Sequence, residues 1–191
     1  MKIRQSGMPE ADYWNQFFNP DICIDLLFGE KGCLGNTLEL GCGYGTFSLA
    51  AAKKTHGRLL ALDIELELVQ QLNAQSKTLD ITNILAIQRD FIADGLGVLD
   101  QSQMHIMIYN LLHLDDPIAL LKNVYKAVHS QGRVSIMHWR SDVPTPRGPS
   151  LDIRPKPDLV VDWLEQVGFK TVELVDLSYC SPYHYGLIAT I

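Results

Sequence analysis

In this 191-residue sequence, the segment that most strongly suggests chemistry contains three glycines at alternate positions. Gly41, Gly43 and Gly45 follow the predicted strand Thr37–Leu40 and precede a segment with helical periodicity. Because glycine has no side chain, a tight turn of this composition lets a ligand lie against the backbone and near the positive end of the next helix. The pattern therefore predicts a nucleotide-type binding loop, with a glycine-rich turn that serves only packing as the alternative.

Asp63 ends the next apolar run, about twenty residues after the glycines. An acidic side chain at that place can accept hydrogen bonds from both hydroxyls of an adenosine ribose. The dinucleotide fingerprint G-x-G-x-x-G/A requires glycine or alanine where this chain has Thr46, and the third glycine comes one residue early, at Gly45. The spacing therefore argues against an NAD-dependent reductase and leaves other adenosine-containing cofactors.

Two histidines are candidate general bases. His113 comes shortly after the apolar run 104–109, and His138 lies near the end of the run 134–139. The carboxyl ends of parallel strands meet at the sheet edge where open α/β folds bind ligands, so we expect both histidines there. Each could take a proton from a substrate or donate a hydrogen bond to it. A neutral histidine paired with backbone is the structural alternative for either one.

Strand and helix patterns alternate from about residue 37 to residue 139. We therefore expect a sheet to position the glycines, Asp63 and the two histidines. Such alternation is typical of an α/β, doubly wound fold with a mostly parallel sheet and helices on both faces. An antiparallel strand pair is predicted over 171–177 and 185–191. The predicted parallel strands are Thr37–Leu40, Leu59–Asp63, Ile84–Gln88, 104–109 and 134–139.

The sequence predicts a single domain over residues 1–191. Its predicted parts are an N-terminal helical cap (1–35), a cofactor-binding core (36–139), a proline-rich loop (140–157) and a C-terminal helix and strand pair (158–191). In the cap, the aromatic segment 9–18 could form a lid or simply a packed helix.

The loop 140–157 holds five of the nine prolines and has no periodic pattern, which is typical of functional lids. Its basic residues exceed its acidic ones, so an anionic acceptor group is one interpretation and a solvated surface loop the other. The charged residues are Arg140, Arg147, Arg154 and Lys156 against Asp142 and Asp152.

The segment ELGCGYG at 39–45, followed by ALDI at 61–64, resembles the class I S-adenosylmethionine-dependent methyltransferases. RDF at 89–91, NLLH at 110–113 and GRV at 132–134 agree with that family in order and spacing. The resemblance covers residues 36–139 and, by architecture, 158–191. It implies a seven-stranded sheet in the order 3-2-1-4-5-7-6 with the last strand antiparallel, and S-adenosylmethionine as cofactor.

The resemblance also implies a set of cofactor-binding residues. Glu39 would orient the glycine loop and the amino end of the methionine, and Asp63 would bind the ribose. Ile64 would pack on the adenine, whose edge Asp90 and Phe91 would hold. The full implied set is Glu39, Gly41, Cys42, Gly43, Gly45, Asp63, Ile64, Asp90, Phe91, Asn110 and Leu111.

Three of these positions need further comment. Asn110 and Leu111 would contact the methionine through their backbone atoms. Asp90 could instead cap a turn over residues 91–95. Cys42, between two glycines, is interpreted as a small buried filler and not as a nucleophile.

Composition narrows the function classes. Sixteen Lys and Arg against 22 Asp and Glu give a net charge of −6, which disfavours a nucleic-acid partner. The four cysteines lack metal-ligand spacing, so we expect reduced thiols and no metal site. No apolar run predicts a membrane span or a signal peptide, which favours a cytoplasmic protein without a membrane partner.

The predicted function is S-adenosylmethionine-dependent methylation of oxygen, nitrogen or carbon in a small-molecule acceptor, without metal. The run before His113 lacks the N-P-P-Y signature of amino-methylating enzymes, which favours a small molecule over a nucleic acid or a protein nitrogen. A non-catalytic S-adenosylmethionine-binding module is the alternative, and a reductase is less well supported. The sequence carries no prediction of oligomeric state.

Overall fold

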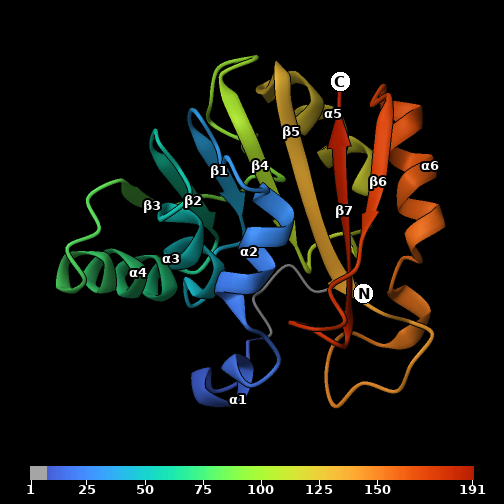
Figure 1. Ribbon diagram of the computed structural model, residues 1–191, viewed down its shortest axis with the longest axis horizontal. Coiled ribbons are helices and arrows are strands. Elements are labelled where there is room, and N and C mark those ends of the chain that lie inside the picture. The colour runs from blue at the N-terminus through green and yellow to red at the C-terminus, as the bar shows by residue number, and fades with distance from the viewer. Residues whose placement is uncertain (1–7) are drawn as a thin grey trace.

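The computed structural model describes residues 8–191, so the first seven residues of the predicted cap lie outside the described residues (Figure 1). Seven strands form one sheet in the order β3-β2-β1-β4-β5-β7-β6, in which β7 is antiparallel to both of its neighbours. The predicted fold class and strand order are therefore confirmed. The strands are β1 (Thr37–Leu40), β2 (Leu59–Asp63), β3 (Ile84–Gln88), β4 (Gln103–Tyr109), β5 (Val128–Trp139), β6 (Thr171–Val175) and β7 (His184–Thr190).

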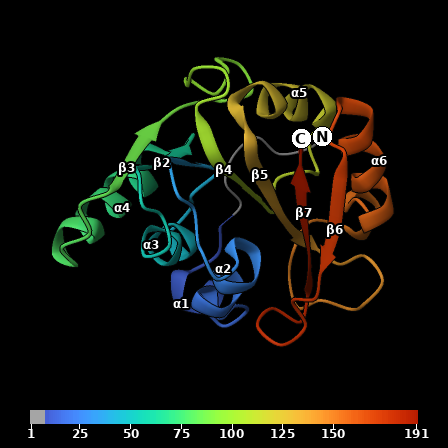
Figure 2. The same cartoon turned by 45° about the horizontal axis from the view of Figure 1, so that its top comes forward.

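The helices cover both faces of this sheet, and each face has its own buried cluster. Residues of α2, α3 and α4 pack in one cluster and residues of α5 and α6 in the other, which agrees with their placement in Figure 2. A short 3-10 helix over Leu151–Ile153 interrupts the long loop. The α-helices are α1 (Ala11–Asn15), α2 (Pro20–Phe28), α3 (Thr46–Ala52), α4 (Leu66–Thr78), α5 (Pro117–Ala127) and α6 (Pro157–Val167).

Helix ends follow local chemistry that the sequence displays. The Asn19 side chain accepts a hydrogen bond from the Ile22 N–H at 3.2 Å, and Pro20 is the first residue of α2. The Asp116 carboxylate caps α5 in the same way. At the other end of a helix, α6 stops at Gly168, whose φ of 122° favours glycine. Side-chain N-caps such as those of Asn19 and Asp116 typically stabilise a helix by about 1 kcal/mol.

Strand β5 is longer than its apolar pattern indicates, because it begins at Val128 and not at residue 134. The sequence pattern predicted this strand only over 134–139. The strand also includes Gly132, where an added Cβ would lie 3.0 Å from the Gln103 carbonyl oxygen. The pairing of β4 with β5 is irregular between Gln103 and His105, which accommodates this close approach.

The aromatic residues of segment 9–18 are packed against the body of the domain. The α-helix there ends at Asn15, earlier than predicted. Trp14, Phe17 and Phe18 are buried in the cluster that contains α2 and α3. This arrangement is the packed-helix interpretation of the segment. Among the described residues, no helix has the length and apolar character needed to cross a bilayer.

The strand order reverses between β1 and β4, since β1 continues to β2 on one side and β4 to β5 on the other. Open α/β sheets bind ligands outside the carboxyl ends of the strands at such a reversal. The loops that leave β1, β2, β4 and β5 on this edge begin at Gly41, Ile64, Asn110 and Arg140.

Candidate functional site

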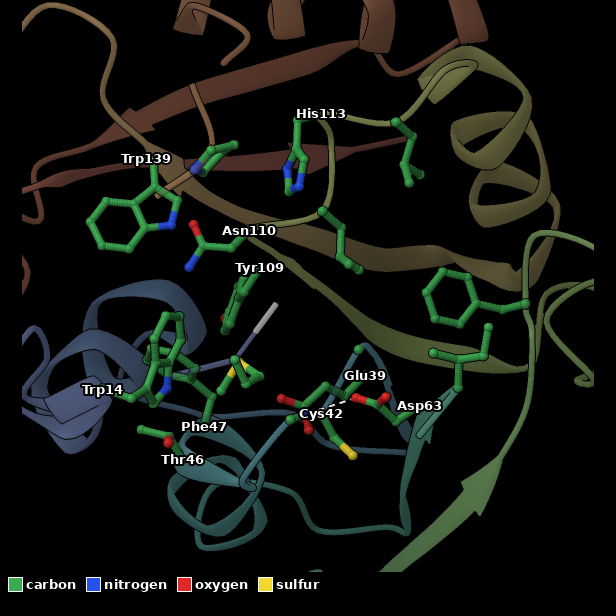
Figure 3. A pocket seen from close by; sticks show the side chains of 18 of the residues that line it. Trp14, Glu39, Cys42, Thr46, Phe47, Asp63, Tyr109, Asn110, His113 and Trp139 are labelled. Carbon is green, nitrogen blue, oxygen red and sulfur yellow. Dashed lines mark hydrogen bonds between the residues drawn. The ribbon is translucent and has the colours of Figure 1, made fainter. Parts of the chain in front are cut away.

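A cavity of about 390 Å³ lies at this edge of the sheet (Figure 3). Its volume is within the range of roughly 300–1,000 Å³ found for small-molecule sites. Residues from β1, β2 and β4, from the loops that follow them, from α1 and α3 and from the long loop all contribute to its wall. It brings together these residues predicted from the sequence: Glu39, Gly41, Cys42, Gly43, Asp63, Ile64, Asp90, Phe91, Asn110, Leu111 and His113.

The glycine loop leaves β1 with left-handed backbone. Gly41 has φ of 75° and Gly43 has φ of 51°, conformations that residues with a Cβ rarely adopt. A Cβ on Gly41 would lie 3.1 Å from the Leu111 side chain. Both glycines line the cavity, so their backbone is open to close approach by a ligand.

Gly45 has a different role from the one implied by the resemblance. It lies outside the cavity lining and forms the N-cap of α3 with φ of 78°. A Cβ there would lie 2.5 Å from Cδ1 of Leu72 in α4. Packing between the glycine loop and α4 therefore explains this glycine, and a direct contact with cofactor does not.

Asp63 ties the end of β2 to the glycine loop. Its Oδ2 accepts a hydrogen bond from the Gly43 N–H at 2.8 Å, and its Oδ1 accepts one from the Glu65 N–H at 3.0 Å. Burial raises the pKa of this carboxyl, while these backbone hydrogen bonds oppose the shift. A carboxylate offers about four acceptor positions, so Asp63 can still accept bonds from ligand hydroxyls.

Glu39 lies at the base of the cavity and is only 3% exposed. The Ser48 hydroxyl of α3 donates a hydrogen bond to its Oε2. Burial raises the pKa of Glu39 to about 8, with a further increase from the negative charge of Asp63 and an opposing effect from Ser48. A cationic group bound beside Glu39 would favour its ionised form.

Asp90 caps the turn that follows β3, which was the alternative interpretation of this residue. Its Oδ1 accepts hydrogen bonds from the Ile92 and Ala93 N–H groups at 3.1 and 3.0 Å. The cap accounts for the place of this carboxyl group at the start of the turn, and Asp90 also lines the cavity. Phe91, the next residue, is buried and also lines the cavity.

The two histidines are partners, and only one of them reaches the cavity. His113 lines it, whereas His138 is fully buried and lies outside the lining. The prediction that His138 could act on a substrate directly is therefore wrong. His113 Nδ1 and His138 Nε2 are 3.2 Å apart, and His138 Nδ1 is 3.3 Å from the Trp139 carbonyl oxygen.

This geometry assigns the tautomers. A carbonyl oxygen can only accept, so His138 Nδ1–H donates to Trp139, and His138 Nε2 accepts from the Nδ1–H of His113. Burial lowers the pKa of His138 to about 3, with a further lowering by His113, so His138 stays neutral. His113 consequently carries a lone pair on Nε2, the form that a general base requires.

Asn110 follows β4 with left-handed backbone, at φ of 57°. Its N–H donates to the Met137 carbonyl at 2.7 Å, so a backbone contact with a ligand would use the Asn110 carbonyl. Asn tolerates this conformation better than most residues with a side chain. The irregular backbone at this point turns the chain out of the sheet and toward the cavity.

Aromatic residues form much of the remaining wall and were not included in the sequence-based site. Trp14, Phe47, Tyr109 and Trp139 line the cavity, from α1, α3, β4 and β5. Trp14 and Trp139 are in contact, with ring centroids 6.4 Å apart. The signal available in the sequence was the aromatic residue at the carboxyl end of each of two strands, Tyr109 and Trp139.

The loop 140–157 contributes Arg147, Gly148 and Pro149 to the cavity wall. Arg140 forms an exposed ion pair with Asp142 at 2.8 Å. The basic residues of the loop therefore have different surroundings: Arg147 lies at the cavity wall, whereas Arg140 is paired with Asp142.

Arg154 organises this loop from inside and is only 7% exposed. Its guanidinium donates to the carbonyl oxygens of Pro149, Arg140 and Arg147 at 2.7, 2.8 and 3.2 Å, and to the Thr145 hydroxyl at 2.8 Å. It also lies over the Trp139 ring, 5.7 Å from the centroid. Four of its five N–H donors are thus bonded to loop oxygens, so Arg154 serves the structure of the loop, and the anionic-acceptor interpretation of the loop stays a prediction.

The cysteine thiols lie in the interior of the protein. Cys23, Cys33, Cys42 and Cys180 are free and buried. Burial raises the pKa of the Cys42 thiol, which agrees with a buried filler. Within residues 8–191, no group of three or more His, Cys, Asp or Glu side chains is arranged to hold a metal ion.

Comparisons with known proteins agree with this architecture. The family described as methyltransferase domain matches residues 37–132. No curated protein matches the chain in sequence.

Solved structures similar to this chain include an S-adenosylmethionine-dependent methyltransferase from Aquifex aeolicus, with 20% identity, a TM-score of 0.77 and coverage of 91% of this chain and 90% of that one. A protein from Sulfolobus solfataricus that is described as a type 11 methyltransferase has 24% identity and a TM-score of 0.69. The match covers 91% of this chain and 92% of that one. The 4+2 cyclase SpnF has 15% identity, a TM-score of 0.69 and coverage of 86% and 60%. The fold is thus shared with proteins described by different activities.

Proposed function

We propose, from the premise that this chain belongs to the methyltransferase domain family, that it transfers the methyl group of S-adenosylmethionine to a small-molecule acceptor. The family match covers half of the chain and includes the glycine loop, Asp63, Asp90 and His113. The recognition of a class I S-adenosylmethionine-dependent methyltransferase from the sequence is confirmed by this match and by the sheet order. The identity of the contacts and of the acceptor is our proposal.

The observation that carries the proposal is the glycine loop tied to Asp63 at the floor of the cavity. Gly41 and Gly43 leave backbone open to a ligand, and Asp63 is held by the Gly43 N–H with acceptor capacity remaining. This is the arrangement required for the ribose and the methionine end of an adenosine cofactor. Ile64, Asp90 and Phe91 line the same wall, where the adenine would be held.

Glu39 would take the cationic amine of the methionine moiety. It is the acidic side chain buried deepest under the glycine loop, and burial raises its pKa. A bound ammonium group would stabilise its ionised form. The bound cofactor supplies an electrophilic methyl group on a sulfonium.

His113 would act as general base where the acceptor is an O–H or N–H group. Displacement at a sulfonium disperses positive charge, so placement in line with the leaving sulfur is the main requirement, and proton removal is the second. The His113 Nε2 lone pair accepts the acceptor proton, and His138 holds the imidazole in the tautomer that makes this possible. His138 is thus a positioning residue.

The acceptor side of the cavity would be formed by the loop 140–157 and the aromatic residues. Arg154 draws three loop carbonyls around one guanidinium, which places Arg147, Gly148 and Pro149 against the cavity. A preformed wall of this kind lowers the entropic cost of binding a small molecule. This is the part of the site that would select the acceptor.

The direct test is transfer of label from methyl-labelled S-adenosylmethionine to a pool of small metabolites, with mass spectrometry of the products. The proposal predicts a labelled product that forms only with active protein and forms far more slowly with the His113→Ala variant. Binding of the cofactor with no labelled product from any pool would indicate a non-catalytic binding module. That outcome would contradict the proposed activity.

A further inference from the structure

Asn110 belongs to the cavity wall and has an unsatisfied carboxamide. Its Oδ1 and Nδ2 are both buried, and neither has a hydrogen-bond partner among residues 8–191. The residue nevertheless lines the cavity. A buried donor and acceptor left unpaired destabilise the folded chain, and nearly all such groups in native proteins have partners. A ligand that pairs with both atoms would remove this cost.

The carboxamide lies on the acceptor side of the cavity. Figure 3 shows it directed toward Trp139 and Trp14, while Glu39 and Asp63 lie on the other side. The backbone from which this side chain extends is held in place, because the Asn110 N–H donates to the Met137 carbonyl oxygen. The φ of Asn110 is 57°. Left-handed backbone at a residue other than glycine is concentrated at functional sites.

The nearest walls around this amide are aromatic. The neighbouring walls are the indole rings of Trp14 and Trp139. Arg154, behind Trp139, has four of its five N–H donors bonded to loop oxygens, and the buried His138 stays neutral because burial lowers its pKa to about 3. Arg147 is the basic residue of the loop that lines the cavity. The carboxamide itself is neutral and has one donor and one acceptor side by side.

We propose that the Asn110 carboxamide recognises the methyl acceptor, and that this acceptor is an uncharged molecule presenting a donor and a carbonyl on adjacent atoms, as a primary or cyclic amide does. The inference rests on the proposed function and names its substrate class. Amide-to-amide pairing satisfies both Asn110 atoms, and it does so whichever way the carboxamide is turned. A carboxylate offers acceptors only, so it would leave Asn110 Oδ1 facing a negative charge.

The test uses benzamide and benzoate as a matched pair of probes, added to the protein saturated with S-adenosylhomocysteine. Binding is followed by NMR through the indole N–H signals of the tryptophans. We expect benzamide to bind at least tenfold more tightly than benzoate. In Asn110→Gly and Asn110→Asp, benzamide should bind about tenfold or more weakly, since one or both hydrogen bonds are lost.

Both variants suit the backbone at this position, because glycine and aspartate adopt positive φ more readily than other residues. Asn123→Asp, on α5, is the matched control and should leave benzamide binding unchanged. Equal benzamide affinity in the wild type and both Asn110 variants would overturn the inference, and so would tighter binding of benzoate. A loss of S-adenosylhomocysteine affinity in these variants, with benzamide affinity retained, would assign the carboxamide to the cofactor instead.

The two proposals fail in distinguishable ways. If the wild type does not bind S-adenosylhomocysteine, the proposed function fails before any probe is added. If it binds S-adenosylhomocysteine and benzamide binds no better than benzoate, the proposed function stands and the amide-type acceptor is rejected.

Discussion

At the scale of single residues, burial decides what the titratable side chains of this site can do. His138 and His113 have the same side chain, yet full burial keeps one neutral while the other lines the cavity. Glu39 is an acid whose pKa is raised to about 8 in the folded chain. Residue type alone suggested a functional role for each of the three side chains. Their different surroundings show that the roles differ.

Glu39 should make both stability and cofactor binding depend on pH. Its folded pKa of about 8 lies above the ordinary value of 4.5, so the folded state holds a proton that the unfolded state releases between these values. Stability from this group is full below about pH 4.5 and is lost as pH rises through 8. In Glu39→Gln, urea unfolding should show a shallower fall of stability over that range; an unchanged slope would contradict the assigned pKa.

The same residue should couple cofactor affinity to pH with the opposite sign. Binding of a cationic amine requires the ionised carboxylate, so the affinity of the wild type for S-adenosylhomocysteine should increase as pH rises toward 8. Glu39→Gln should bind more weakly and without this dependence, as measured by calorimetry in buffers of different ionisation heat. A wild-type affinity that is flat between pH 6 and pH 8 would argue against the amine contact.

Substitutions of His113 and His138 should distinguish the general base from the residue that positions it. His113→Ala should lower kcat by about 10²–10⁴-fold with little change in cofactor affinity, because a base is lost. His138→Ala should also lower kcat, since the His113 tautomer is no longer held, and His138→Gln should restore part of it by offering an acceptor. Full rates in both alanine variants would leave placement of the substrates as the whole mechanism.

At the scale of elements, one buried side chain, Arg154, makes four of the side-chain hydrogen bonds that hold the loop 140–157. Four oxygen atoms of the loop bond to the Arg154 guanidinium, and no repeating pattern in the sequence marks which of its basic residues has this role. Prolines and charge predicted a stiff, basic loop. Only the folded path of the chain shows that Arg154 faces inward and that Arg147 lies at the cavity.

Trypsin provides a measurement of this loop that needs no acceptor. The Arg147 carbonyl accepts a hydrogen bond from Arg154, so the bond between Arg147 and Gly148 should resist cleavage in the native protein. Arg154→Gln should be cut there at least tenfold faster, because losing several hydrogen bonds increases the population of the open loop. Arg140→Gln, which removes an exposed ion pair, is the control; equal cleavage of both variants would contradict the role of Arg154.

At the scale of the whole molecule, the sequence predicted the sheet, and most residues of its proposed cofactor site line one cavity, while their contacts with the cofactor stay a prediction. Short-range patterns carry that information, since strand runs, the glycine loop and Asp63 are each readable from nearby residues. The aromatic wall joins Trp14, Phe47 and Trp139, which are distant in sequence. Burial of His138 and the extension of β5 to Val128 also depend on tertiary packing, so spacing alone could not predict them.

The most direct test of the central claim is calorimetric titration with S-adenosylhomocysteine and with NAD⁺. The wild type should bind S-adenosylhomocysteine and show no comparable affinity for NAD⁺. Asp63→Ala should bind S-adenosylhomocysteine about a hundredfold or more weakly, because two hydrogen bonds to a charged acceptor, worth roughly 1.5–3 kcal/mol each, are lost. Glu173→Ala, on the exposed side of β6, should retain wild-type affinity. Unchanged affinity in Asp63→Ala, or tighter binding of NAD⁺ by the wild type, would contradict the account.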